Sequence, residues 1–150
     1  MPEIHVETTV PATPERVFEA LTTEDGIKSF WTDQAKVSAE VGSVAEFGFG
    51  PEWAMRLQMR VDVLEAGSQV KWHCLGDFPE WLETDVVWDL AAADEGGTTV
   101  RLHHLGWESA EQSLPSVNFT WAMILAQLAK NLGSGESQPM MVSSDGSHGG

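Results

Sequence analysis

Apolar and polar residues follow two different periods along this chain: a period of two in several short segments and a helical period in one long segment. Between residues 114 and 132, apolar side chains recur at steps of three and four, which places them on one face of an α-helix. The stripe consists of Leu114, Val117, Trp121, Ile124, Leu128 and Leu132, and Phe119, Met123 and Leu125 widen it. Ser113 suits the N-cap, Pro115 suits the first turn, and Gly133 follows the last periodic residue. The pattern predicts a helix over residues 114–132 of roughly 28 Å, long enough to lie across a sheet.

The first thirty residues predict one strand and two short helices. Residues 3–10 alternate between apolar and polar side chains, as in a strand with one buried face. Thr13 is a suitable N-cap for a helix over residues 14–21. A second helix is expected over residues 24–30, although Gly26 lowers helix propensity by about 1 kcal/mol relative to alanine. The side chains expected to point inward here are Ile27, Phe30 and Trp31.

The sequence that follows, up to residue 107, predicts six more strands joined by turns. The expected strands are two around the Gly42–Ser43 turn within residues 35–50, then residues 55–64, 70–75, 84–90 and 98–107. Residues 55–64 have the clearest alternation, and the expected buried face consists of Met55, Leu57, Met59, Val61 and Val63. Phe47 and Phe49 are expected to share a face on the preceding strand.

This order of elements predicts an α+β fold in a single domain. A curved antiparallel sheet of about seven strands would wrap around the long C-terminal helix, with two short helices after the first strand. No internal repeat or change of composition divides residues 1–132. Residues 133–150 are rich in glycine and serine and contain no lysine or arginine, so we expect them to form a disordered tail.

Charge and composition exclude several classes of partner. The chain carries 23 acidic and 8 basic residues, for a net charge of −15, which opposes contact with nucleic acid and anionic lipid. It has no apolar run long enough to span a membrane and no signal-peptide pattern at its start. Cys74 is the sole cysteine, so an internal disulfide is impossible. We expect a soluble cytoplasmic protein that binds no nucleic acid and does not insert into membranes, with its oligomeric state left open.

Several motifs resemble the SRPBCC superfamily. They are the opening VETTVPATPERVFEALTTEDGIKSFW, the VGS turn at residues 41–43, the strand RVDVLEAGSQVKWH, and the closing helix with Trp121, Leu125, Leu128 and Lys130. The resemblance covers residues 3–132 and implies the helix-grip fold, which START lipid-transfer domains and the major birch pollen allergen share. Within the superfamily, the chain most resembles the bacterial branch related to the activator of the ninety-kilodalton heat-shock protein ATPase.

The resemblance implies a cavity between the long helix and the concave face of the sheet. Such a cavity would bind a small hydrophobic ligand, such as a lipid, a polyketide or an aromatic molecule. Its expected ligand-binding residues are Phe47, Phe49, Met55, Met59, Trp72, Trp88, His104, Trp121 and Leu125, with Leu57 and Cys74 on the same inward faces. Two alternatives stay open: a protein-interaction module whose partner is a chaperone or another protein, and a cyclase- or aromatase-like enzyme. The same residues could also fill a close-packed core. No cofactor is implied.

His104 is the candidate for acid–base chemistry because it is the ionisable residue on the inward register of the last strand. The alternative is a hydrogen-bonded core histidine. On the outer face of the sheet, a group of potential metal ligands could gather, namely His73, Asp85, Asp89 and His103, but their spacing matches no metal motif. We expect weak charge pairs there and no metal site. Cys74 is expected to be a buried, inert thiol.

Overall fold

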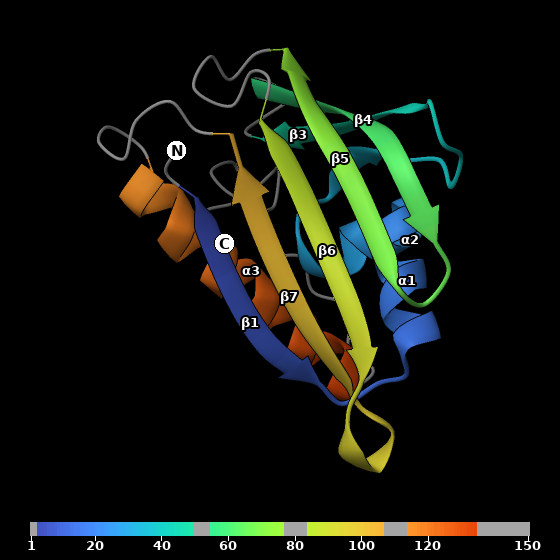
Figure 1. Cartoon of the computed structure of the whole chain (residues 1–150). Coiled ribbons are helices and arrows are strands. Elements are labelled where there is room, and N and C mark those ends of the chain that lie inside the picture. Colours follow the sequence, from blue (N-terminus) through green and yellow to red (C-terminus); the bar gives the residue numbers. More distant parts are fainter. Residues whose placement is uncertain (1–2, 50–54, 77–83, 107–113, 135–150) are drawn as a thin grey trace, which may run out of the picture.

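The computed structural model describes residues 3–49, 55–76, 84–106 and 114–134 of the 150-residue chain (Figure 1). The strands are β1 (Ile4–Val10), β2 (Gln34–Lys36), β3 (Val44–Phe49), β4 (Met55–Glu65), β5 (Gln69–Gly76), β6 (Asp85–Ala92) and β7 (Thr98–Leu105). The helices are α1 (Pro14–Thr22), α2 (Glu24–Phe30) and α3 (Leu114–Ser134), and a single 3₁₀ turn, Asp94–Gly96, joins β6 to β7.

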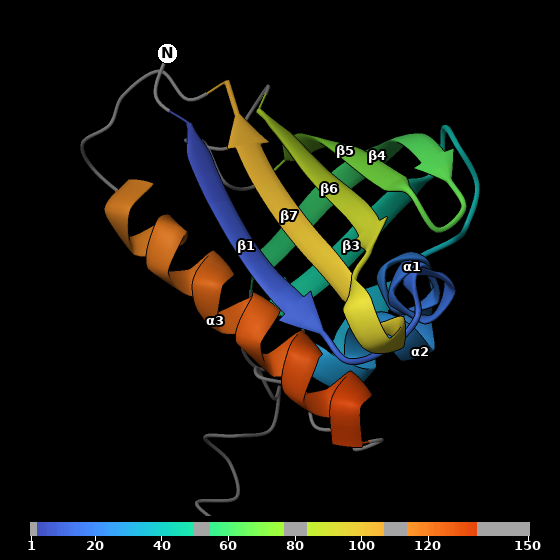
Figure 2. The same ribbon diagram turned by 60° about the horizontal axis from the view of Figure 1, so that its bottom comes forward.

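Within the described residues, the strands form one antiparallel sheet in the order β1-β7-β6-β5-β4-β3-β2. Figure 1 shows the helices behind this sheet, and Figure 2 shows α3 running along β1 while α1 and α2 lie toward the opposite side. A curved sheet, two short helices after the first strand and a long helix at the end make up the helix-grip arrangement. The predicted α+β fold is therefore confirmed.

The β4 strand departs from its predicted alternation at Asp62. Before this residue, Val61 pairs with Trp72, whose side chain points inward. After it, Val63 pairs with Lys71, whose side chain points outward. A β-bulge at Asp62 adds one residue to β4 and exchanges the two faces of the strand. The expectation that Val63 shares the buried face was therefore wrong, because an alternating pattern does not reveal an inserted residue.

Both short helices begin as the sequence predicts, and their contact explains Gly26. The Thr13 hydroxyl oxygen accepts a hydrogen bond from the backbone nitrogen of Arg16 at 3.3 Å, and Thr23 caps α2 through Gly26 N at 3.0 Å. A Cβ atom at Gly26 would lie 2.5 Å from the Cα and carbonyl oxygen of Ala20 in α1. Glycine is therefore required for the close approach of α1 and α2, which outweighs its low helix propensity.

The α3 helix buries the centre of the predicted stripe but exposes two residues assigned to it. Among the described side chains of α3, the fully buried apolar residues are Trp121, Ile124, Leu125 and Leu128. Phe119 and Met123, expected to widen the buried stripe, are instead 66% and 46% exposed. At 3.6 residues per turn, both lie about 160° around the helix from Trp121, so that expectation was wrong.

The ends of α3 differ from the prediction in one respect. The helix continues through Gly133 to Ser134 and does not end at Leu132. Ser113 and the expected tail beyond residue 134 lie outside the described residues. Among the described helices, none is both long and apolar enough to cross a membrane.

Candidate functional site

Five inward-facing aromatic side chains meet between α3 and the sheet. We call them the aromatic cluster: Trp31 after α2, Phe47 on β3, Trp72 on β5, Trp88 on β6 and Trp121 on α3. Each is at most 2% exposed. Ring centroids are 4.7 Å apart for Trp31 and Phe47, 5.4 Å for Trp31 and Trp121, and 5.7 Å for Trp88 and Trp121. Such offset and edge-to-face contacts are favourable for aromatic rings.

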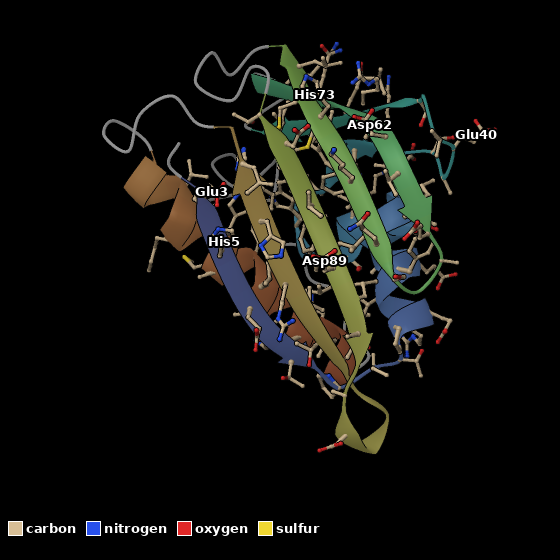
Figure 3. All side chains as sticks on the ribbon, in the orientation of Figure 1. Glu3, His5, Glu40, Asp62, His73 and Asp89 are labelled. Carbon is tan, nitrogen blue, oxygen red and sulfur yellow. The ribbon has the colours of Figure 1, made fainter. Side chains whose placement is uncertain are left out.

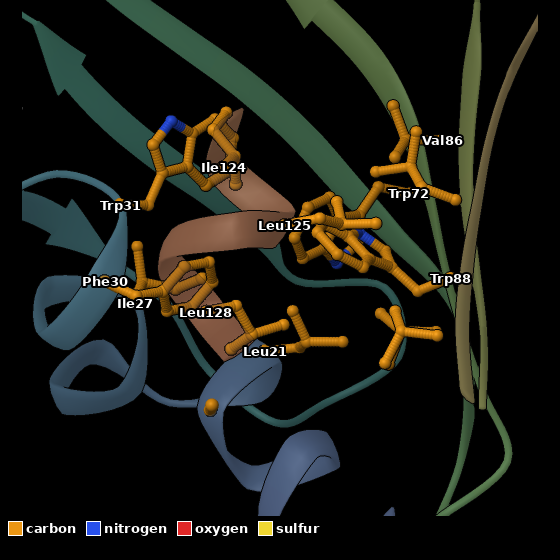
Figure 4. Close-up of a cluster of buried hydrophobic side chains, with 14 of the residues drawn as sticks. Leu21, Ile27, Phe30, Trp31, Trp72, Val86, Trp88, Ile124, Leu125 and Leu128 are labelled. Atoms are coloured by element: carbon orange, nitrogen blue, oxygen red, sulfur yellow. The ribbon is translucent and has the colours of Figure 1, made fainter. Parts of the chain in front are cut away.

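The cluster lies where the helices and the sheet converge. Figure 4 shows Ile124, Leu125 and Leu128 of α3 between the short-helix residues Leu21, Ile27 and Phe30 and the sheet residues Trp72, Val86 and Trp88. The aromatic cluster is therefore continuous with the main hydrophobic core.

Buried hydrogen bonds connect the aromatic cluster to β7 and to Thr84, the residue before β6. The indole nitrogen of Trp121 donates to His104 Nδ1 at 3.1 Å, and His104 Nε2 lies 2.9 Å from the Thr84 hydroxyl oxygen. Because an indole N–H can only donate, Nδ1 must be the acceptor and the imidazole hydrogen must sit on Nε2. His104 is therefore held as one neutral tautomer, with Nε2–H donating to Thr84.

Burial lowers the pKa of His104 to about 3 from its ordinary value of 6.5. The side chain is fully buried, and desolvation disfavours its charged form. A base this weak accepts protons poorly near neutral pH. The geometry accordingly describes a hydrogen-bonded core histidine, and an acid–base role for His104 stays a prediction.

Cys74 is also a buried member of this polar group. Its backbone nitrogen donates to the Thr84 carbonyl oxygen at 2.8 Å. Burial raises the pKa of the Cys74 thiol to about 12, although a hydrogen bond from the Thr84 side chain opposes this shift. Since the thiolate is the nucleophile, such a cysteine is chemically inert in the folded protein.

Trp88 presents a different situation. Its indole nitrogen Nε1 is buried and has no hydrogen-bond partner among the described residues. An unpaired buried donor typically costs on the order of 1–3 kcal/mol. Trp88 lies on β6 beside the edge-on ring of Trp121, with an interplanar angle of 88°. The Trp88 N–H group is therefore a buried donor inside the aromatic cluster for which the described residues offer no acceptor.

The structure brings most of the predicted ligand-binding residues together. Those with described side chains, all buried, are Phe47, Met59, Trp72, Trp88, His104, Trp121 and Leu125. Phe49 and Met55 pair across β3 and β4, but their side chains lie outside the described part of the structure. Trp31 and Thr84 were not among the predicted ligand-binding residues. Thr84 could have been found, because it shares the even-numbered inward register with Val86 and Trp88.

On the outer face of the sheet, the four potential metal ligands form two separate pairs. His73 Nδ1 lies 2.8 Å from an Asp85 carboxylate oxygen, and His103 Nε2 lies 3.1 Å from Asp89. The bulged Asp62 joins the first pair, so that ligand atoms of Asp62, His73 and Asp85 lie within 4.8 Å of one another.

Asp62 is already engaged by Arg60. Its carboxylate oxygens accept from Arg60 Nε at 2.6 Å and from Arg60 Nη2 at 3.3 Å. The hydrogen bond from Arg60 lowers the pKa of the Asp62 carboxyl. A divalent cation at this cluster would compete with the guanidinium for the same oxygens.

Comparisons with known proteins agree with this architecture. The family model described as "Activator of Hsp90 ATPase homolog 1-like protein" matches residues 11–133. The solution structure of the Aha1 dimer from Colwellia psychrerythraea is 30% identical, covers 90% of this chain and 98% of its own, and superposes with a TM-score of 0.80. A search of curated proteins found no significant match.

Two further solved structures share the fold at lower identity. The protein SSP2350 from Staphylococcus saprophyticus is 18% identical over 94% of this chain and 98% of its own, with a TM-score of 0.77. DynU16, from the dynemicin biosynthetic locus, is 21% identical over 95% of this chain and 51% of its own, also with a TM-score of 0.77. At these identities the likeness concerns the fold alone.

Proposed function

The chain belongs to the family of Activator of Hsp90 ATPase homolog 1-like proteins, and from that premise we propose that it binds a planar, largely apolar molecule beside the aromatic cluster. The family and the fold support a ligand-binding or interaction module in general. The site would lie between α3 and the concave face of the sheet, at the residues predicted from the sequence. One fold relative, DynU16, comes from the dynemicin biosynthetic locus, which is consistent with a small-molecule role for this fold.

The observation that carries the proposal is the buried N–H of Trp88. It lacks a described acceptor, whereas the neighbouring indole of Trp121 is bonded to His104. A ligand with a carbonyl, ether or hydroxyl oxygen could accept from Trp88 and remove the cost of the unpaired donor. Apolar pockets commonly fix the orientation of a ligand through a few polar groups of this kind.

The surroundings also favour a neutral, flat ligand. Indole and phenyl rings of the aromatic cluster offer faces and edges for stacking with a planar molecule. A net charge of −15 makes an anionic ligand less favourable. We therefore expect a neutral aromatic or polycyclic molecule with at least one oxygen acceptor.

A test compares two neutral fluorescent probes. Nile red has a carbonyl oxygen, whereas pyrene is a hydrocarbon without an acceptor. Trp88→Phe removes the indole N–H, and Trp72→Phe serves as the matched control because it removes a similar volume from the same cluster. One hydrogen bond corresponds to roughly 3–10-fold in affinity. We expect Trp88→Phe to weaken Nile red binding by about that factor more than it weakens pyrene binding.

The control decides the interpretation. Trp72→Phe should affect the two probes to a similar extent. If Trp88→Phe also affects both probes equally, the Trp88 N–H does not anchor the ligand. If the unmodified protein binds neither probe, the aromatic cluster is a closed core and the proposal fails.

A second candidate function is interaction with another protein through α3. Phe119 and Met123 lie on its outward face and are 66% and 46% exposed. The described part of α3 carries a single charged residue, Lys130, so its outward face is mostly apolar. Because the relative from Colwellia psychrerythraea is described as a dimer, we take a second copy of this chain as the partner.

Sedimentation equilibrium tests this interaction. Phe119→Gln combined with Met123→Gln should weaken self-association, whereas Val41→Gln, at a 63% exposed apolar position outside α3, should not. A chain that stays monomeric at all concentrations would rule out the second candidate. Equal effects of both substitutions would place the interface elsewhere.

A further inference from the structure

Two histidines face each other on the outer side of the sheet, away from the aromatic cluster. Figure 3 labels one of them, His5, together with Glu3 and Asp89. His5 on β1 and His103 on β7 are register partners in antiparallel strands. Their Nδ1 atoms are 2.7 Å apart, and their ring centroids are 4.9 Å apart. The two Nδ1 atoms thus lie near the line that joins the ring centroids and face each other.

A carboxylate holds the far nitrogen of each ring. Glu3 Oε1 lies 2.9 Å from His5 Nε2, and Asp89 Oδ2 lies 3.1 Å from His103 Nε2. Asp89 is itself positioned by Gln69, whose amide nitrogen donates to the other carboxylate oxygen at 2.8 Å. The arrangement therefore runs carboxylate, imidazole, imidazole, carboxylate across β1, β7 and β6.

The hydrogen bonds fix which nitrogens carry hydrogen. Ionised carboxylates only accept, so the Nε2 atoms of His5 and His103 must both donate. The contact between the two Nδ1 atoms requires one further hydrogen, shared between them. Four ring nitrogens then share three hydrogens, one of which lies between the two Nδ1 atoms.

We propose that His5 and His103 bind a divalent transition-metal ion through their Nδ1 atoms, with the ion replacing the shared hydrogen. Imidazole nitrogen suits Zn²⁺, Cu²⁺ and Ni²⁺. A histidine that binds a metal commonly donates its other N–H to a carboxylate, which fixes the ring and makes it a better ligand. Here both rings have that carboxylate in place.

The geometry needs a small adjustment to admit the ion. Two nitrogen ligands at the usual zinc distance with tetrahedral angles are about 3.3 Å apart, compared with 2.7 Å between the Nδ1 atoms here. Rotation of the rings can supply the difference, because the His5 side chain is 53% exposed. Solvent access also allows water to complete the coordination. Binding displaces the shared hydrogen, so it releases up to one proton per ion.

The charged residues around the two histidines are either acidic or already in an ion pair. Arg101, two residues from His103 on the same face of β7, bonds to Glu7 at 2.7 Å. Glu3 and Asp89 add two negative charges behind the rings. The Asp62, His73 and Asp85 cluster is a weaker candidate because it offers one nitrogen and because Arg60 occupies Asp62.

The full chain contains five histidines, which makes a substitution test tractable. Zn²⁺ binding is measured by isothermal titration calorimetry in two buffers of different ionisation enthalpy, which also counts released protons. His5→Ala and His103→Ala should each abolish the tight site. His73→Ala and His148→Ala are the matched controls and should leave it unchanged.

The carboxylates provide a more specific readout. Glu3→Gln and Asp89→Asn keep both imidazoles but remove the charged acceptor behind each ring, and should weaken binding by roughly 10–100-fold. With Cu²⁺, electron paramagnetic resonance should show two nitrogen ligands in the unmodified protein and one in His103→Ala. His5 is exposed, so its substitution is expected to preserve the thermal melt.

Several outcomes would overturn the site. Failure of the unmodified protein to bind Zn²⁺ or Cu²⁺ would mean that the pair shares a proton only. Loss of binding in His73→Ala or His148→Ala, with His5→Ala unaffected, would move the ion elsewhere. A copper spectrum with one nitrogen in the unmodified protein would contradict coordination by both rings.

Discussion

Acidification should destabilise this protein through His104, which is buried and neutral. Its pKa in the folded protein is about 3, below its ordinary value of 6.5, so the unfolded chain binds more protons than the folded protein between these values. The stability that depends on neutral His104 is fully present above pH 6.5 and is lost as the pH falls toward 3. At 1.36 kcal/mol per pH unit, the loss from neutral pH to pH 4.5 is about 3 kcal/mol.

The assay compares the unmodified protein with His104→Gln. A glutamine amide supplies one acceptor for Trp121 and one donor for Thr84, as His104 does, but does not titrate. Urea unfolding curves at several pH values give the free energy of unfolding of each protein. The other histidines and the carboxylates titrate in both chains, so their contributions largely cancel in the difference.

The expected result concerns how that difference changes with pH. The unmodified protein should lose about 3 kcal/mol relative to His104→Gln between neutral pH and pH 4.5. Parallel curves for the two proteins would refute the reasoning. They would mean that water reaches His104 in the folded protein, either directly or after a local rearrangement, so that the side chain is not kept buried in solution.

Three further predictions follow from individual contacts. Gly26→Ala should lower the free energy of unfolding by about 1–3 kcal/mol despite its better helix propensity, since its Cβ would lie 2.5 Å from Ala20 backbone atoms; an unchanged or higher urea midpoint would contradict this. Cys74, whose pKa burial raises to about 12, should react with a thiol reagent only after unfolding, and rapid labelling of the native protein would show otherwise. Truncation after Ser134 should leave the melting temperature unchanged, because residues 135–150 offer little apolar surface; a decrease of several degrees would show that they pack on the domain.

Local sequence patterns were sufficient to predict the elements and most of their buried faces. Alternation with a period of two identified the strands and placed Trp72, Trp88 and His104 on the inward side, where they lie. Helical spacing identified the buried face of α3, including Trp121. Capping by Thr13 followed from its hydroxyl group and its place before proline. In each case the physical cause acts between residues that are close in sequence.

Features that depend on the approach of distant segments were not predictable in the same way. The bulge at Asp62 changes the pairing with β5 without altering the composition of β4. The sequence presents Gly26 as a weakness of α2, whereas in the fold a Cβ atom at this position would lie 2.5 Å from the backbone of Ala20. The misplacement of Phe119 and Met123 has a local cause: they were assigned to the buried side because they are apolar, although their helical angle points them outward. The sequence also gave no sign that His5 faces His103, 98 positions away.

The neighbouring residues His103 and His104 show how strongly one strand register constrains this protein. His104 points inward and is stable there as a neutral side chain bonded to Trp121, whereas His103 points outward and bonds to Asp89. A slip of β7 by one residue would exchange the two faces. It would bury Arg101 and expose Leu102, so the apolar alternation alone opposes it. It would also separate Trp121 from its acceptor, His104, and His103 from Asp89. The hydrogen bonds of both histidines therefore help to hold the correct register.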